Sequence, residues 1–271
     1  IKRGFVNFLA IFLGVSLSFL AEDWREDLNE VEDGLRSLQG IVADINQDLG
    51  PAASLARTDS IATEWGLWLH RNWERDALPV DSVDQALQAL HSGAPYTPVR
   101  SEYESAKYAG RLQYLENPEL RQQITQLYES SQPLLVHVYD LRTDFTLELW
   151  RLLRPYESYA PTFGGGGTVP RVHLQADWSE LRNNTSLRNA LVESISLRRV
   201  FSSLLRNHVR QSTRLREAVR AELVAAGMTV PADTVEDAVV GEDAAPGDEE
   251  DAAPGDEERP SEDPAMPEES S

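Results

Sequence analysis

Residues 2–27 read KRGFVNFLAIFLGVSLSFLAEDWRED, and this stretch decides how the rest of the chain is interpreted. The basic pair Lys2 and Arg3 precedes 18 uncharged, mostly apolar residues at positions 4–21. At a helical rise of about 1.5 Å per residue, these residues reach roughly 27 Å, close to the thickness of a bilayer's hydrocarbon core. The pattern therefore predicts a transmembrane anchor over residues 1–21.

A cleaved signal peptide is the alternative interpretation of this segment. Signal peptides have shorter apolar stretches, and they carry small residues at the first and third positions before the cleavage site. Cleavage after Ala21 places the bulky Phe19 at the third of these positions. For these two reasons we favour the uncleaved anchor.

The residues that flank the anchor predict its orientation. Lys2 and Arg3 lie before it, and Trp24 and Arg25 follow it among carboxylates. Basic residues favour the cytoplasmic side of a membrane, and tryptophan favours the lipid–water interface. We therefore expect these four residues at the membrane interface. The anchor is then a single-pass helix in a bacterial inner membrane, with the rest of the chain in the periplasm.

The segment after the anchor has a heptad pattern. Its apolar residues recur at alternating spacings of three and four, which is typical of a helix that packs against other helices. The pair Gly50 and Pro51 is expected to end this helix. The pattern predicts a rigid helix that runs from the membrane into a bundle. The heptad residues are Leu28, Val31, Leu35, Leu38, Val42, Ile45 and Leu49.

Helical periodicity continues along the chain, with two local features of interest. Trp65, Trp68 and Trp73 fall on one face of a helix, where core packing is favoured over a ligand site or a membrane contact. Pro133 lies inside a helical pattern and predicts a kink or break there. The predicted helices after the heptad segment cover residues 51–75, 81–91, 117–154 and 186–226.

These patterns predict an all-α fold with three parts. Residues 1–21 are the transmembrane anchor, and residues 22–227 form an elongated antiparallel bundle of four to six helices. An irregular loop at residues 155–177, with four consecutive glycines, interrupts the bundle. Residues 228–271 form an acidic low-complexity tail.

The tail carries most of the net charge of −20. It holds 16 Asp and Glu residues against one Arg, and the octapeptide DAAPGDEE occurs twice in succession. Such a segment has too little apolar surface to offset the entropy of ordering the chain, so we expect it to be disordered. Either it is a solvated, solubilising tail or it contacts a basic surface.

The last predicted helix carries many arginines on one face. A solvated face with salt bridges is the simplest interpretation, and contact with the acidic tail, an acidic partner or anionic lipids are the alternatives. Nucleic acid is not an expected partner, because no aromatic interleaving or known binding motif accompanies the arginines. The candidate contact residues are Arg199, Arg206, Arg210 and Arg214.

One block of the chain is more specific than the rest. It combines Tyr103, Glu104 and Gly110 with the sequence NPELR at residues 117–121, in which Asn117 is an expected helix N-cap. Together with an anchor that ends in DWRE, this block resembles a family of uncharacterised bacterial proteins with one N-terminal membrane helix. The resemblance covers about residues 4–130, although an alanine replaces the usual leucine at position 106. It implies an anchored helical bundle and no activity.

No pattern of catalytic or metal-binding residues is visible. The chain has no cysteine, its glycine run lacks a phosphate-binding motif, and no nucleophile-elbow sequence occurs. Five histidines are scattered without the spacing of a helical metal site. We therefore predict no catalytic residues, no metal, no cofactor and no enzymatic activity. The histidines are His70, His91, His137, His173 and His208.

These features together predict a non-enzymatic, membrane-anchored structural or accessory subunit. Its expected partners are the lipid bilayer and other subunits of a larger bacterial membrane complex, such as a photosynthetic or respiratory assembly. A single-pass extracytoplasmic sensor or ligand-binding module is the alternative. A hydrolase whose site is assembled only in space ranks last.

Overall fold

The computed structural model describes residues 2–160, 171–175 and 177–231, and the side chains of residues 2–11, 27, 158–160, 171 and 172 lie outside this description. The described chain is mostly helical, which confirms the predicted all-α class. The α-helices are α1 (Lys2–Arg71), α2 (Val80–His91), α3 (Ser101–Tyr108), α4 (Pro118–Gln126), α5 (Gln132–Leu153), α6 (Trp178–Arg182) and α7 (Thr185–Ala225).

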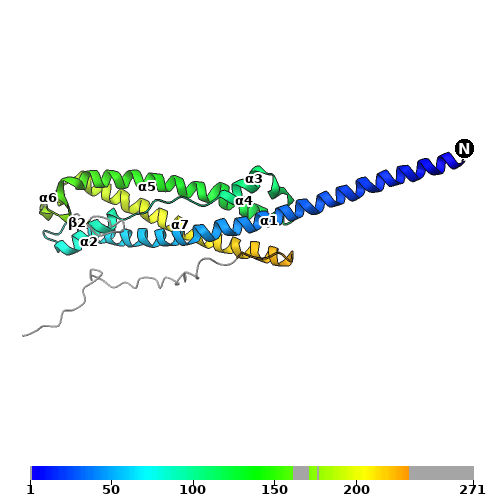
Figure 1. Cartoon of the computed structure of the whole chain (residues 1–271). Coiled ribbons are helices and arrows are strands. Elements are labelled where there is room, and N and C mark those ends of the chain that lie inside the picture. The colour runs from blue at the N-terminus through cyan, green and yellow to red at the C-terminus, as the bar shows by residue number, and fades with distance from the viewer. Residues whose placement is uncertain (1, 161–170, 176, 232–271) are drawn as a thin grey trace, which may run out of the picture. The chain divides into compact units, whose positions relative to one another are not determined.

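The bundle is built on three long helices, α1, α5 and α7. Helices α1 and α5 run in one direction, and α7 packs between them in the opposite direction (Figure 1). Residues 92–100 connect α2 to α3 by returning along the bundle without regular secondary structure. Short helices close the two ends of the bundle, with α3 and α4 at one end and α2 and α6 at the other.

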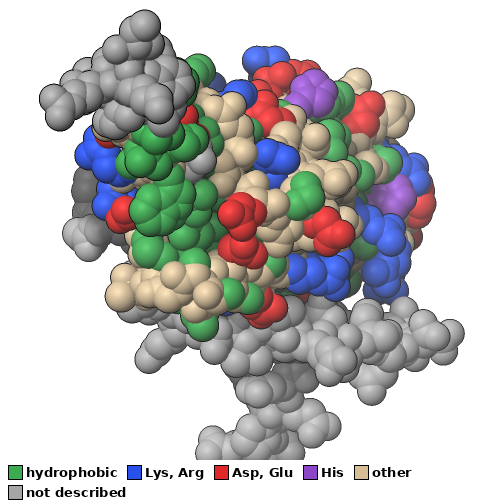
Figure 2. Space-filling view, turned by 90° about the vertical axis from the view of Figure 1, so that its right-hand side faces the viewer, with side chains coloured by type: hydrophobic (Ala, Val, Ile, Leu, Met, Phe, Trp, Pro, Cys, Tyr) green, Lys and Arg blue, Asp and Glu red, His purple; other side chains and the backbone are tan. Residues whose placement is uncertain are grey.

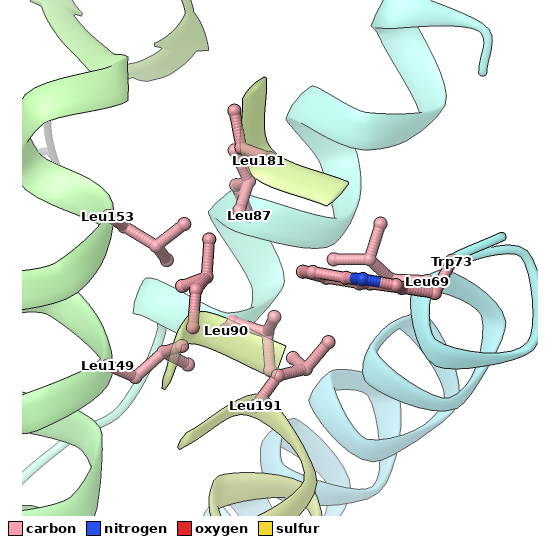
Figure 3. Close-up of a pocket in the computed structure, with 9 residues that line it drawn as sticks. Leu69, Trp73, Leu87, Leu90, Leu149, Leu153, Leu181 and Leu191 are labelled. Carbon is pink, nitrogen blue, oxygen red and sulfur yellow. The ribbon is translucent and has the colours of Figure 1, made fainter. Parts of the chain in front are cut away.

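The buried apolar residues form two clusters along the bundle. The first cluster joins α1 to α7 near α3 and α4, and it includes the heptad residues Leu38, Val42 and Ile45, all 2% exposed or less. The second cluster lies near α2 and α6, where leucines from α1, α2, α5 and α7 surround Trp73 (Figure 3). It leaves a cavity of about 10 Å³, which is about the space that one water needs.

Helix α1 runs without a break through Pro51, so the predicted end at Gly50 and Pro51 is wrong. A proline inside a helix removes one hydrogen bond and costs about 3 kcal/mol or more. The buried stripe continues on both sides of it, with Leu49 before and Leu55 after. Burying such side chains gains about 1.5–3 kcal/mol each. Packing against α7 therefore outweighs the cost of the proline.

The first part of α1 extends beyond the bundle (Figure 1). Most side chains from Phe12 to Trp24 are exposed, and the heptad positions become buried only from Leu38 onward. Among the residues whose side chains are described, no helix combines the length and apolar character needed to cross a bilayer. The predicted anchor at residues 1–21 lies partly outside those residues.

The other predicted helices are present, with local differences. A single π-helical turn, Leu127–Ser131, connects α4 to α5 immediately before Pro133, which is where a break was predicted. Such a turn changes the hydrogen-bond pattern next to a residue that has no N–H group. Asn117 caps α4 as predicted, because its side chain accepts a hydrogen bond from Leu120 N at 3.1 Å.

The region predicted as an irregular loop contains a short hairpin. Strands β1 (Glu157–Ala160) and β2 (Arg171–Leu174) pair antiparallel, with Glu157 opposite Leu174. The glycine run lies outside the described residues. Of the predicted acidic tail, only residues 228–231 are described, and they pack back on the bundle: Gln39 Nε2 donates to Thr229 O at 2.6 Å.

Candidate functional site

Three charged side chains from three different helices meet inside the bundle. Asp59 of α1 accepts hydrogen bonds at Oδ1 from Arg142 of α5 (2.5 Å) and from Arg198 of α7 (2.8 Å). Arg198 also donates to the backbone oxygens of Leu90 and Ser92 at 2.5 and 3.1 Å. Asp59 and Arg198 are both 0% exposed, and Arg142 is 4% exposed. This cluster, the Asp59 cluster, holds the three long helices together.

The Asp59 cluster carries an excess of positive charge, since one carboxylate faces two guanidinium groups. Burial lowers the pKa of Arg198 to about 10, the neighbouring charge of Arg142 adds to the decrease, and Asp59 opposes it. A buried charge is costly unless it is paired and hydrogen-bonded. The Nε atoms of Arg142 and Arg198 make no hydrogen bond within the part of the chain that the structure describes.

A cavity of about 160 Å³ adjoins the Asp59 cluster. Arg142 and Arg198 line it, and so do Thr146 and Trp150 of α5. The Thr146 hydroxyl and the Trp150 indole N–H also have no hydrogen-bond partner among the described residues. Gly93 lines the cavity too, and a Cβ at this position would lie 2.8 Å from Arg142 Nη2. The glycine therefore leaves room for the guanidinium group.

His91 also lines this cavity, and a carboxylate lies next to its ring. His91 Nε2 lies 3.3 Å from Glu157 Oε2, its Nδ1 lies 2.8 Å from Leu87 O, and its ring stacks on Trp150. Both ring nitrogens face oxygen atoms, one from α2 and one from β1, and these contacts fix the orientation of the ring.

A second buried histidine lies nearer the middle of the bundle. Asp48 Oδ2 is 2.7 Å from His208 Nε2 and accepts a hydrogen bond from Tyr96 at 3.2 Å. Ser212 Oγ lies 3.5 Å from the same His208 Nε2. A serine–histidine–aspartate relay needs the serine and the aspartate on opposite ring nitrogens. The arrangement here joins helices α1 and α7 without forming that relay.

Asp44 of α1 caps a different helix, α3. Its carboxylate accepts hydrogen bonds from Ser101 Oγ (3.0 Å) and from the backbone N–H groups of Glu102 (2.8 Å) and Tyr103 (3.1 Å). Asp44 is only 2% exposed, and α3 has no capping side chain of its own. A carboxylate at this position also interacts favourably with the helix dipole.

Replacing Asp44 by alanine is expected to destabilise the protein by about 2–4 kcal/mol, because three donors, of which the Tyr103 N–H is buried, lose a buried charged acceptor. Thermal unfolding followed by circular dichroism measures the loss. The variant Asp44→Asn keeps one carbonyl acceptor and is expected to lose about half as much. A loss below about 1 kcal/mol in the alanine variant contradicts the capping role.

The block that resembles the uncharacterised family lies around α3 and α4. Tyr103 stacks on Tyr128 with ring centroids 4.3 Å apart, and it donates to Glu129 Oε1 at 2.8 Å. Hydrogen bonds from Lys107 and Tyr103 lower the pKa of Glu129. Gly110 has a positive φ of 70°, which favours glycine and ends α3 sharply. The residues of this block thus have structural roles.

The four predicted contact arginines form one exposed stripe along α7. Arg199, Arg206, Arg210 and Arg214 are separated by seven, four and four residues, which places them on one side of the helix. None of them forms an ion pair with the described residues. Arg206 donates to Ser60 and Ser202, and Arg210 donates to Asn207. The stripe is therefore open to an anionic partner.

Two other arginines from the same predicted face are buried instead. Arg198 belongs to the Asp59 cluster, and Arg216 is 9% exposed and lies 3.4 Å from Asn46 Oδ1. Of the predicted membrane-interface residues, Trp24 is 67% exposed and Arg25 is paired with Glu22 at 2.6 Å. The side chains of Lys2 and Arg3 lie outside the described residues.

Within the described part of the chain, no group of three His, Asp or Glu side chains is arranged to hold a metal ion. The chain matches no family of known proteins, no curated protein and no solved structure. The resemblance to the uncharacterised family therefore rests only on the residues that carry it.

Sequence reasoning missed the residues of the Asp59 cluster. Asp59 occupies a position in the buried stripe of α1 between Ala56 and Ala62, where an apolar residue is expected. Arg142 and Arg198 hold the equivalent positions on α5 and α7. A charged residue in the apolar stripe of each of three helices was the signal available. This signal does not reveal that the three charges contact one another, because the contact depends on how the helices are aligned.

Proposed function

We propose that this protein is a non-enzymatic, membrane-anchored accessory subunit of a larger bacterial membrane complex. In this proposal the first turns of α1 lie in the lipid of the inner membrane, and the bundle lies on the periplasmic side. The continuity of α1 carries the proposal, since one helix extends from the apolar N-terminal segment into the core of the bundle. A continuous helix of this kind fixes the position of the bundle relative to the proposed membrane segment.

Exposed apolar side chains on α1 support the anchor. Phe12, Leu17, Phe19 and Leu20 are 58–67% exposed, although each is a large hydrophobic residue. Viewed from the end where α1 leaves the bundle, hydrophobic side chains gather on one side, and mixed charged side chains cover much of the rest (Figure 2). An extended apolar surface of this kind indicates contact with lipid or with another protein.

The arginine stripe supports contact with a partner. Four exposed arginines, which have no carboxylate partner among the described residues, extend over about 22 Å of α7, since the helix rises about 1.5 Å per residue. Arginine suits interfaces because its planar group pairs with carboxylates at two points. The acidic tail of this chain or an acidic surface of a neighbouring subunit is the proposed contact.

Charged substitutions in α1 test the anchor. The double variant Leu13→Asp, Leu17→Asp is expected to release the full-length protein from washed membranes. Each buried aspartate costs about 3 kcal/mol at the centre of a membrane helix. Membrane fractionation followed by immunoblotting measures the release.

A matched control separates this effect from misfolding. Val200 and Val224 of α7 are 49% and 65% exposed, and Leu13 and Leu17 are 50% and 64% exposed. The two valines belong to the bundle and lie outside the proposed membrane segment. Val200→Asp with Val224→Asp is expected to leave the protein in the membrane fraction. If the wild-type protein is recovered in the soluble fraction, or if both double variants behave alike, the anchor is wrong.

A sensor or ligand-binding module is the second candidate, and the cavity beside the Asp59 cluster favours it. Asp59 belongs to α1, so a ligand in this cavity acts on the helix that leads to the proposed membrane segment. A sensor needs an output domain on the other side of the membrane. Mass spectrometry of the intact protein from its native cells distinguishes a sensor from an accessory subunit. Only a sensor requires a substantial domain upstream of Ile1.

A further inference from the structure

We infer that the cavity bounded by Arg142, Arg198, Thr146 and Trp150 binds a small monocarboxylate anion. This inference goes beyond the accessory role and holds whether or not the protein belongs to a larger complex. It rests on the charge balance of the cavity, on its unpartnered donors and on its size.

The charge balance calls for one negative charge. Two guanidinium groups and one carboxylate leave the Asp59 cluster with an excess of one positive charge. A net charge inside a protein costs several kcal/mol unless a counter-ion is present. A monoanion in the adjoining cavity neutralises the excess charge of the Asp59 cluster, whereas a dianion makes the total charge negative.

The donors around the cavity call for an acceptor. The Arg142 and Arg198 Nε groups, the Thr146 hydroxyl and the Trp150 indole N–H all lack a hydrogen-bond partner among the described residues. Arg142, Arg198 and Thr146 are each more than nine-tenths buried. A carboxylate has only acceptor atoms, with about four lone-pair positions, so it matches a site that offers several donors.

The size and the walls of the cavity restrict the rest of the ligand. A volume of about 160 Å³ is far larger than the space that one water needs, and it leaves room for a small molecule. Pro95, Leu147 and the ring of Trp150 provide apolar walls. A carboxylate with a short aliphatic chain fits this combination, and a large or strongly polar molecule does not.

The inference is tested on the purified full-length chain in mild detergent with acetate and propionate as probes. Thermal unfolding and titration calorimetry are run at constant ionic strength, with chloride and inorganic phosphate for comparison. Acetate and propionate are expected to bind at one site and to raise the unfolding temperature by roughly 5 °C at saturation. An equal shift with chloride, or a larger one with phosphate, overturns the inference, as does no shift with either carboxylate.

Removing an unpartnered donor gives the sharper test. Thr146→Val deletes a hydroxyl that has no partner in the described structure, so the stability of the ligand-free protein is expected to stay the same or rise. Its affinity for propionate is expected to fall about tenfold, because one ligand hydrogen bond is lost. The variant Trp150→Phe is expected to behave in the same way.

The control for these variants is Thr213→Val on α7. The Thr213 hydroxyl donates to Val209 O at 2.8 Å, and Thr213 does not line the cavity. This variant is expected to bind propionate with the wild-type affinity. If Thr146→Val and Trp150→Phe also keep the wild-type affinity, the carboxylate does not occupy this cavity and the inference is wrong.

Discussion

Replacing Asp59 by alanine is expected to destabilise the bundle by about 3–5 kcal/mol or more, enough to unfold a protein of ordinary stability. Among the residues that the structure describes, the Asp59 carboxylate is the only anionic partner of Arg142 and Arg198, and all three groups are buried. Without it, two positive charges remain next to each other in the protein interior. Circular dichroism at 25 °C and thermal unfolding measure the loss.

Two further variants serve as comparisons for Asp59→Ala. Asp59→Asn keeps the size of the side chain but removes its charge, so it is also expected to lose several kcal/mol. Asp33→Ala, on the same helix, removes a partly exposed carboxylate 3.7 Å from Arg36 and is expected to cost about 1 kcal/mol or less. If Asp59→Ala is no more damaging than Asp33→Ala, the Asp59 cluster does not hold the helices together.

Replacing Trp73 by alanine is expected to cost about 3–5 kcal/mol, because a large side chain is lost from a closely packed core. Trp73 is 2% exposed, contacts Trp178 edge-on at 5.2 Å between ring centroids, and donates from its indole to Arg182 O at 3.1 Å. The substitution removes the packing that joins the end of α1 to α6. Thermal unfolding by circular dichroism measures the effect.

Trp65 provides the matched control for this prediction. It lies in α1, about two turns before Trp73, which follows the end of that helix, but it is only partly buried and packs edge-on against Trp68 with ring centroids 5.8 Å apart. Trp65→Ala is expected to cost about 1–2 kcal/mol. Equal losses in the two variants contradict the view that the tryptophans serve mainly to fill the core near α2 and α6.

Most of the helices could be predicted from the sequence because their signals are local. The heptad residues of α1, the Asn117 cap and the long apolar stripe of α7 each depend on residues within a few turns. The core packing of Trp73 followed from the same periodicity. These features needed no knowledge of which helices are neighbours.

The errors arose where tertiary contacts override a local signal. Gly50 and Pro51 read as a helix end, yet α1 continues because α7 covers it on both sides of the proline. Residues 157–160 and 171–174 form a hairpin that depends on pairing between two segments without a strong strand pattern. Local propensity is a weak guide at such positions.

The candidate site could not be predicted because it depends on three distant segments. Asp59, Arg142 and Arg198 are separated by more than fifty residues each, and no spacing motif connects them. A similar limit applies to Asp44, which caps a helix that begins at Ser101. Only the alignment of α1, α5 and α7 brings these side chains together.

The most direct test of the central proposal is purification of the full-length protein from its native membranes in mild detergent. Blue-native electrophoresis and mass spectrometry then identify the proteins that accompany it. The proposal predicts that the chain is extracted only with detergent and migrates with other membrane subunits in a fixed stoichiometry. Recovery of the chain alone, or in the soluble fraction without detergent, contradicts it.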